Sequence, residues 1–365
     1  IGRVAALLVA AVTVLTVAHP TGRYLLRAAR EAAGILLRRR PIAEVAADPA
    51  TPASTRAKLA LVVAAQRFAA DSVRLEAGES FTEYSAYHRD TLVLVLSAAR
   101  RDLLRARSWW FPIVGRVPYK GFFDPALARR EAADLEEQGL DTYLRPASAF
   151  STLGWFNDPI LPTTLRLDSL DLTDTVIHEL LHNTFYARGQ AVFNESFANF
   201  VGARGAQWFW RSRGEAGAAA ELERRWADEL LLGAFWTQTY AALDSAYAEH
   251  PEDSLARVRA RDAVYARRRQ VLLAEVGPHL RTRDPRLLTR TRFDNALLLA
   301  RRIYLTDLDL FEAVHAREGG DLRRTIARVT TLARESPDDP YGALRVWLGG
   351  NVARGAPVAT PRTGS

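Results

Sequence analysis

Residues 174–202 read DTVIHELLHNTFYARGQAVFNESFANFVG. Within this stretch His178 and His182 are four residues apart, and on an α-helix that spacing puts both imidazoles on one face, one turn apart. Both rings can then reach a single metal ion, and Glu179, beside the first ring, is placed to take a proton from metal-bound water. The pattern therefore predicts a catalytic metal site carried by a helix.

The residues around the two histidines predict the limits of this helix. Asp171, Thr173 and Asp174 supply a capping residue and first-turn acids, and Gly189 supplies a stop. An apolar stripe beside the imidazole face would bury the helix against a core. The stripe consists of Val176, Ile177, Leu180 and Leu181.

Glu195 is the expected third ligand. A turn around residues 187–190 would fold a second helix back antiparallel on the first and bring Glu195 to the open side of the imidazoles. The chain has no cysteine, so a metal must be held by His, Asp, Glu or water. Two His and one Glu with water in the fourth position form a catalytic zinc arrangement. We expect one Zn²⁺ per chain, held by His178, His182 and Glu195.

The second helix supports this geometry. Glu195, Ala198, Asn199 and Gly202 fall at i, i+3, i+4 and i+7, a small and polar face that lets two helices approach closely. Asn199 is expected to accept a hydrogen bond from the outer nitrogen of a ligand imidazole and so fix its tautomer. The alternative is a helical hairpin with buried, hydrogen-bonded polar residues and no metal, but unpaired carboxylates are costly to bury without a cation.

HELLH followed by NESFA looks like a gluzincin, and the wider sequence resembles the bacterial putative aminopeptidase family of envelope-associated proteins. The resemblance covers roughly residues 20–345. Its matching strings are RRRPI at 38–42, FPIVGRVPYKGFFD at 111–124, SAFSTLGWFNDPIL at 148–161, HELLH at 178–182 and FNESFANFVG at 193–202.

The resemblance implies peptide bond hydrolysis, with Glu179 passing the proton of the metal-bound water to the leaving amine. Tyr304 and Tyr119 are candidate donors to the developing oxyanion, although a buried structural tyrosine is the alternative for each. By analogy with other gluzincins, an edge strand near residues 151–156 would pair with an extended peptide substrate. The substrate-binding candidates are Ser151, Thr152, Leu153, Gly154 and Asp158, the last as partner for a free α-amine or simply as a turn residue before Pro159.

The expected fold is α+β and mostly helical, with a zincin-like catalytic core, a small sheet and flanking helices. The predicted regions are a membrane anchor or signal-like segment at 1–20, a helical region at 21–110, the core at 111–205, a second helical region at 206–350 and a disordered tail at 351–365.

The apolar run at residues 4–18 favours a cell-envelope location, anchored in the inner membrane or periplasmic, rather than a buried N-terminal helix. The arginines that follow this run, where the positive-inside rule expects cytoplasm, leave the membrane side open. The formal net charge is +7, but the arginines are interleaved with acids and form no basic stripe, which argues against nucleic acid as a partner.

The sequence leaves three functions open. The first is a zinc aminopeptidase, the second is a zinc endopeptidase or another metallohydrolase on the same site, and the third is a non-catalytic, membrane-associated zinc-binding module. Cleavage of N-acetylated peptides separates the first two, and a fourth metal position filled by protein would indicate the third.

Overall fold

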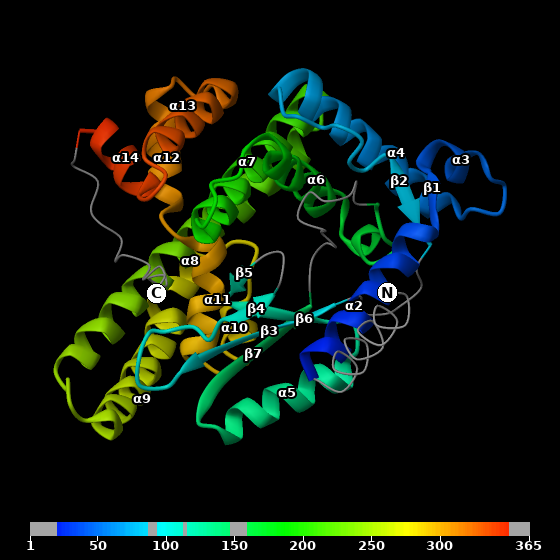
Figure 1. The fold of residues 1–365 in the computed structure, drawn as a ribbon. Helices are drawn as coiled ribbons and strands as arrows, with labels where there is room; N and C mark the ends of the chain where they lie inside the picture. Colours follow the sequence, from blue (N-terminus) through cyan, green and yellow to red (C-terminus); the bar gives the residue numbers. More distant parts are fainter. Residues whose placement is uncertain (1–19, 87–92, 112–114, 147–158, 350–365) are drawn as a thin grey trace, which may run out of the picture.

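The computed structural model describes residues 20–86, 93–111, 115–146 and 159–349. These residues form a mostly helical α+β structure with small antiparallel sheets, as the sequence predicted. Figure 1 shows the helices grouped around a short sheet, with the N-terminal helices and the last three helices at opposite sides of the molecule.

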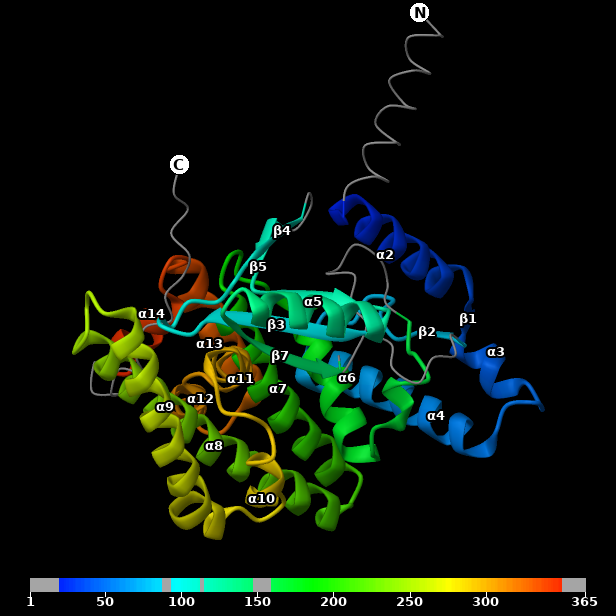
Figure 2. The same cartoon turned by 90° about the horizontal axis from the view of Figure 1, so that it is seen from below.

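The main sheet has three antiparallel strands in the order β6-β3-β7. The central strand β3 spans Leu94–Arg100, and its neighbours are β6 (Tyr119–Phe122) and β7 (Leu140–Pro146). Helix α5 (Pro125–Glu137) lies along one face of this sheet (Figure 2), where Leu96 and Phe122 pack against Ala128 and Leu135. Two smaller sheets pair β1 (Arg39–Pro41) with β2 (Glu83–Ser85) and β4 (Trp109–Phe111) with β5 (Gly115–Val117).

The alternation of side chains along a strand sorts the residues of the sheet between its two faces. In β7, Thr142 and Leu144 face α5, so Asp141, Tyr143 and Arg145 point to the opposite face. That face is covered by helix α11 (Asn295–Leu305) and by the helices beneath it. Because β7 is an edge strand, one side of its backbone is not paired within this sheet.

Helices α6 (Ser169–Thr184) and α7 (Ala191–Ser212) form the hairpin predicted from the sequence. The remaining α-helices surround it. They are α2 (Pro20–Leu37), α3 (Ile42–Ala47), α4 (Ala53–Phe68), α8 (Ala216–Ala248), α9 (Ser254–Val271), α10 (Pro285–Leu288), α12 (Leu308–Arg317), α13 (Leu322–Glu335) and α14 (Pro340–Trp347).

The hydrophobic core is centred on this hairpin. Phe193, Phe197 and Phe200 on α7 are almost fully buried and contact the ring of Phe311 on α12. The same core cluster runs from Ile42 to Leu344, so it includes side chains from all three of the regions predicted for the body of the chain. The central strand β3 also lies outside the region predicted as the core, residues 111–205.

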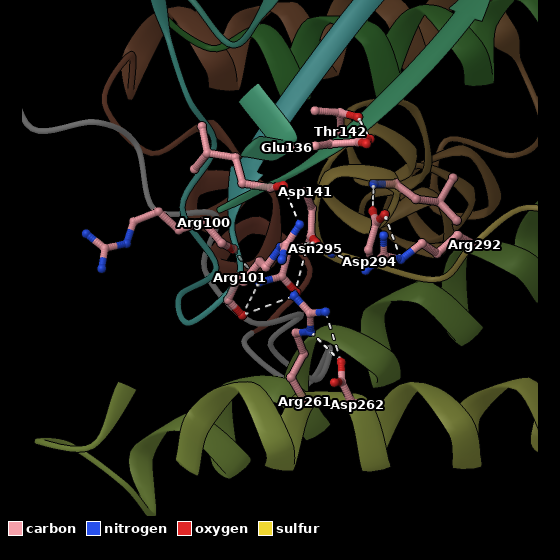
Figure 3. A network of polar contacts seen from close by, with 12 residues as sticks. Arg100, Arg101, Glu136, Asp141, Thr142, Arg261, Asp262, Arg292, Asp294 and Asn295 are labelled. Carbon is pink, nitrogen blue, oxygen red and sulfur yellow. Dashed lines mark hydrogen bonds and ion pairs between the residues drawn. The ribbon is translucent and has the colours of Figure 1, made fainter. Parts of the chain in front are cut away.

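A buried polar network joins the sheet to the helices (Figure 3). The Asp141 carboxylate, with no exposed side-chain surface, pairs with Arg261 of α9 at 2.8 Å and accepts the backbone N–H of Asn295 at 3.1 Å. The Asn295 amide in turn donates to the Arg100 carbonyl at 2.8 Å. These bonds hold the start of β7 against the start of α11.

Among the described residues, no helix combines the length and apolar character needed to cross a membrane. The run predicted as an anchor or signal at residues 1–20 lies almost wholly outside the described residues, so the envelope location stays a prediction. The predicted tail at 351–365 also lies outside them.

Candidate metal centre

Helix α6 begins with a side-chain cap. The Asp168 carboxylate accepts the backbone N–H groups of Leu170 and Asp171 at 2.9 and 2.8 Å, which satisfies two donors that the helix itself leaves unpaired. The helix ends at Thr184, earlier than the predicted stop at Gly189. Phe185 has an extended backbone, and its ring is buried against Phe193 and Phe197 of α7. Burial of this aromatic side chain therefore sets the end of the helix.

The turn between the helices is fixed by Asn194. Its side chain accepts the backbone N–H of Ala187 and donates to the carbonyl of the same residue, both at 2.8 Å. Asn194 is only 2% exposed, so this pair of bonds closes the turn inside the protein. Gly189 has φ +79°, a conformation that favours glycine. The turn thus sits where the sequence predicted it, and it places Glu195 in the first turns of α7.

Glycine allows the two helices to approach closely. A Cβ atom on Gly202 would collide with the Asp174 side chain and would lie 3.1 Å from the Asp174 carbonyl oxygen and from Cβ of His178. A Cβ atom on Gly205 would lie 2.8 Å from Ile177. This agrees with the small, polar face expected along α7.

Three ligand atoms converge across the helix pair. Nε2 of His178 lies 3.5 Å from one carboxylate oxygen of Glu195, and Nε2 of His182 lies 3.5 Å from the other. One ligand atom from each residue lies within 4.8 Å of the other two. Ligands about 2.0–2.1 Å from a tetrahedral zinc are roughly 3.3 Å from one another. These three side chains therefore fit a single divalent ion with little movement.

Burial has the largest effect on the pKa values in this group. It lowers the pKa of His182 to about 4, so that ring is neutral, as a metal ligand must be. For His178, burial alone would lower the pKa, but Glu195, Glu179 and Asp174 outweigh it and raise the pKa to about 9. Burial would raise the pKa of Glu195, yet its hydrogen bond with His178 leaves that pKa below the usual value. A metal ion would take the place of the proton shared by these groups.

Three tyrosines and one arginine surround the Glu195 carboxylate. Tyr186 contacts the His182 ring edge-on, with centroids 6.2 Å apart. Arg145 of β7 donates to the Tyr304 hydroxyl at 3.1 Å. Burial raises the pKa of Tyr304 to about 12, and the Glu195 charge adds to this rise. The pKa of Tyr119 is also raised, by burial first and then by the nearby Tyr304 and Glu195. The structure therefore brings both candidate oxyanion donors into the electrostatic field of Glu195.

Asn199 has a different partner from the one predicted. Its amide nitrogen donates to the Tyr304 backbone carbonyl at 3.1 Å, which joins α7 to the end of α11. Nδ1 of His182 is buried and has no hydrogen-bond partner among the described residues. Among the described residues, the structure thus does not show the predicted hydrogen bond to Asn199 from the outer nitrogen of a ligand imidazole.

A cavity of about 380 Å³ begins one helical turn from the metal ligands. Asp174 lies one turn before His178, and Asn199 lies one turn after Glu195. The sheet and α11 contribute Tyr143, Arg145, Arg301 and Tyr304 to its wall, and α8 contributes Arg225 and Glu229.

The substrate-binding candidates Ser151, Thr152, Leu153, Gly154 and Asp158 lie outside the described residues, so their roles stay predictions. Three further residues near the site were not predicted from the sequence: Arg145, Asn194 and Tyr186. Tyr186 did carry a signal, because it continues the four-residue spacing of His178 and His182. Asn194 could have been singled out as the polar residue before Glu195, whereas Arg145 carried no local signal.

Comparison with known proteins identifies the family of the chain. A family model with the description putative aminopeptidase matches residues 23–342, which is most of the chain. No curated protein and no solved structure matches the chain significantly.

Proposed function

The chain belongs to the putative aminopeptidase family, and on that premise we propose that it is a zinc-dependent aminopeptidase of the gluzincin type, with a zincin-like core built on α6 and α7. His178, His182 and Glu195 hold the ion, and Glu179 is the general base. The convergence of three ligand atoms within 4.8 Å is the observation that carries this proposal. Two histidines four residues apart on one helix and a glutamate on the next helix match a catalytic zinc site with three protein ligands.

A zinc ion bound here would polarise the scissile carbonyl and lower the pKa of a bound water molecule. Glu179 follows His178 directly, and its charge contributes to the raised pKa of both His178 and Tyr304, so its carboxylate lies near both. Glu179 takes the proton from the water and delivers it to the leaving amine. Both transfers happen on the side of α6 that carries the imidazoles.

Tyr304 stabilises the oxyanion in this proposal. With a pKa of about 12, its hydroxyl keeps its proton at neutral pH and can donate it in a hydrogen bond. Arg145 donates to the hydroxyl oxygen at 3.1 Å and so leaves the phenolic O–H for another acceptor. Arg145 therefore acts as a positioning residue for Tyr304.

The test compares wild type with Glu179→Gln, measuring bound zinc by elemental analysis and hydrolysis with a peptide library. Both proteins should hold about one zinc per chain, while the variant should lose orders of magnitude in rate because it lacks the base. Glu137→Gln, at an exposed position on α5, removes the same charge and should leave the rate unchanged. Equal hydrolysis by wild type and Glu179→Gln would refute the role of Glu179.

The family supports an aminopeptidase, which acts only on peptides with a free α-amine. N-acetylated copies of each library substrate test this point. An aminopeptidase should leave them intact, whereas cleavage at comparable rates would indicate an endopeptidase using the same metal site.

A further inference from the structure

The side chains that line the cavity beside the candidate metal centre include more arginines than acids. Four arginines line it, and two of them are already paired with acids: Arg225 with Asp171 at 2.5 Å, and Arg283 with Glu229. The other two, Arg145 and Arg301, have no carboxylate partner among the residues that the structure describes. The cavity therefore presents two guanidinium groups that form no ion pair with a carboxylate of the described residues, although Arg145 also lies in the electrostatic field of Glu195.

The two guanidinium groups come from different elements that meet at the cavity wall. Arg145 projects from the face of β7 that is turned toward α11, and Arg301 lies three residues before Tyr304 on α11. Arg145 uses one nitrogen for the Tyr304 hydroxyl, and its Nε has no hydrogen-bond partner among the described residues. The planar guanidinium group of arginine presents its N–H donors in a fork that matches the geometry of a carboxylate.

Asp174 is the one cavity-lining acid that has no ion pair with an arginine or lysine of the described chain. It lies at the α6 side of the cavity, close to Gly202. One carboxyl group does not neutralise two arginines, so the residues that line the cavity keep an excess of positive charge.

The distance between the candidate metal ligands and the cavity limits which part of a bound peptide can enter the cavity. One helical turn separates Glu195 from Asn199, a rise of about 5.4 Å. An extended peptide covers that distance in one to two residues, at about 3.3–3.6 Å per residue. The edge of the cavity at Asn199 is thus within reach of the first or second residue beyond the scissile bond.

We propose that Arg145 and Arg301 bind a substrate carboxylate in this cavity, so that the enzyme prefers short peptides with a negative charge one or two residues from the scissile bond. The carboxylate is either the C-terminus of a short peptide or an acidic side chain. This inference rests on the proposed peptidase function for the identity of the ligand as a peptide.

The test measures binding by calorimetry in the Glu179→Gln background, where peptide is not consumed. Trialanine and trialanine amide differ only in the C-terminal charge. Ala-Glu-Ala amide and Ala-Gln-Ala amide differ only in a side-chain charge. The charged peptide of one pair should bind about 10- to 100-fold more tightly than its neutral match, as expected for charge-assisted hydrogen bonds. The pair that shows the preference identifies the source of the carboxylate.

Adding Arg145→Gln or Arg301→Gln should reduce the preference by at least several-fold, and Arg145→Lys should restore part of it. The ratio of the dissociation constants of the two peptides in a pair cancels any general effect of Arg145 on Tyr304. Arg267→Gln, at an exposed position on α9, removes the same charge outside the cavity and should keep the full preference. Titrations repeated after removal of metal by a chelator show whether the carboxylate binds arginine or the ion, because only arginine binding survives chelation.

The proposal is overturned if no peptide binds or if neither peptide pair shows a preference for the charged member. It is also overturned if the preference survives both arginine substitutions, or if it disappears when the metal is removed. Failure of the peptidase function gives a different result. In that case wild type hydrolyses no peptide, while the arginine-dependent preference for carboxylate remains.

Discussion

At residue 202 the two helices that carry the candidate metal ligands approach each other closely. Gly202 touches the Asp174 side chain and lies against Cβ of His178, so a methyl group has no free space there. The positions of the ligands on α6 and α7 therefore depend on a residue that makes no contact with the ion itself.

Gly202→Ala should destabilise the protein by about 1–3 kcal/mol, as expected for an overpacked core, and should weaken zinc binding by moving α6 away from Glu195. Denaturant unfolding and zinc titration measure the two effects. Gly217→Ala, on α8 with no atom near the added methyl group, should leave zinc binding unchanged and stability equal or slightly higher. Equal behaviour of the two variants would contradict the close approach of the helices.

Tyr304→Phe should lower kcat about 100-fold with little change in KM, because the hydroxyl acts mainly on the oxyanion of the transition state. Steady-state kinetics on a free-amine dipeptide measures both constants, and elemental analysis should find the same zinc content. A buried structural tyrosine would instead give lower stability with kcat nearly intact.

Spacing alone was enough to predict the group of three side chains that could hold a metal ion. His178, His182 and Glu195 lie on two helices joined by a short turn, and their periodicity carries the geometry. Arg145 could not be found in this way, because it meets Tyr304 only through the packing of β7 on α11. Asn199 was placed on the correct face, but its partner is a backbone carbonyl that no sequence pattern marks.

At the level of elements, the α6–α7 hairpin depends on its turn. Local signals were sufficient to predict the turn at residues 187–190. They did not predict the end of α6 at Thr184, because the burial of Phe185 against α7 ends it. Helix ends that are decided by tertiary contacts carry no capping signature.

Asn194→Ala should cost roughly 2–4 kcal/mol of stability, since it leaves the buried N–H and carbonyl of Ala187 without their side-chain partners. It should also weaken zinc binding, because the turn no longer fixes the start of α7 next to Glu195. Thermal unfolding with and without added zinc measures both effects. If zinc stabilises the variant as much as wild type, the turn does not position the ligand.

At the scale of the whole molecule, the buried network around Asp141 joins the sheet to helices α9 and α11. It holds the first residues of β7 and α11, and the far ends of the same two elements carry Arg145 and Tyr304. The sequence predicted a small sheet and flanking helices. It did not predict how β3, at residues 94–100, joins them, because strand pairing over long separations leaves no local pattern.

The network also makes stability depend on pH through Asp294. Burial, and then the charge of Asp141, raises the pKa of Asp294 from 3.8 to about 6. Its contribution to stability is therefore full below about pH 4 and is lost as pH rises through 6. Relative to Asp294→Asn, which keeps a capping side chain on α11, wild type should lose about 2–3 kcal/mol of stability between pH 4 and pH 7. Urea unfolding across this range measures the difference, and parallel curves would contradict it.

The most direct test of the account is a crystal structure of zinc-loaded protein with anomalous data collected on both sides of the zinc absorption edge. We expect a single strong peak about 2.0–2.2 Å from Nε2 of His178, Nε2 of His182 and one oxygen of Glu195, with the fourth position open to solvent. A peak elsewhere, or a Glu195 carboxylate turned away from the two imidazoles, would contradict the central claim.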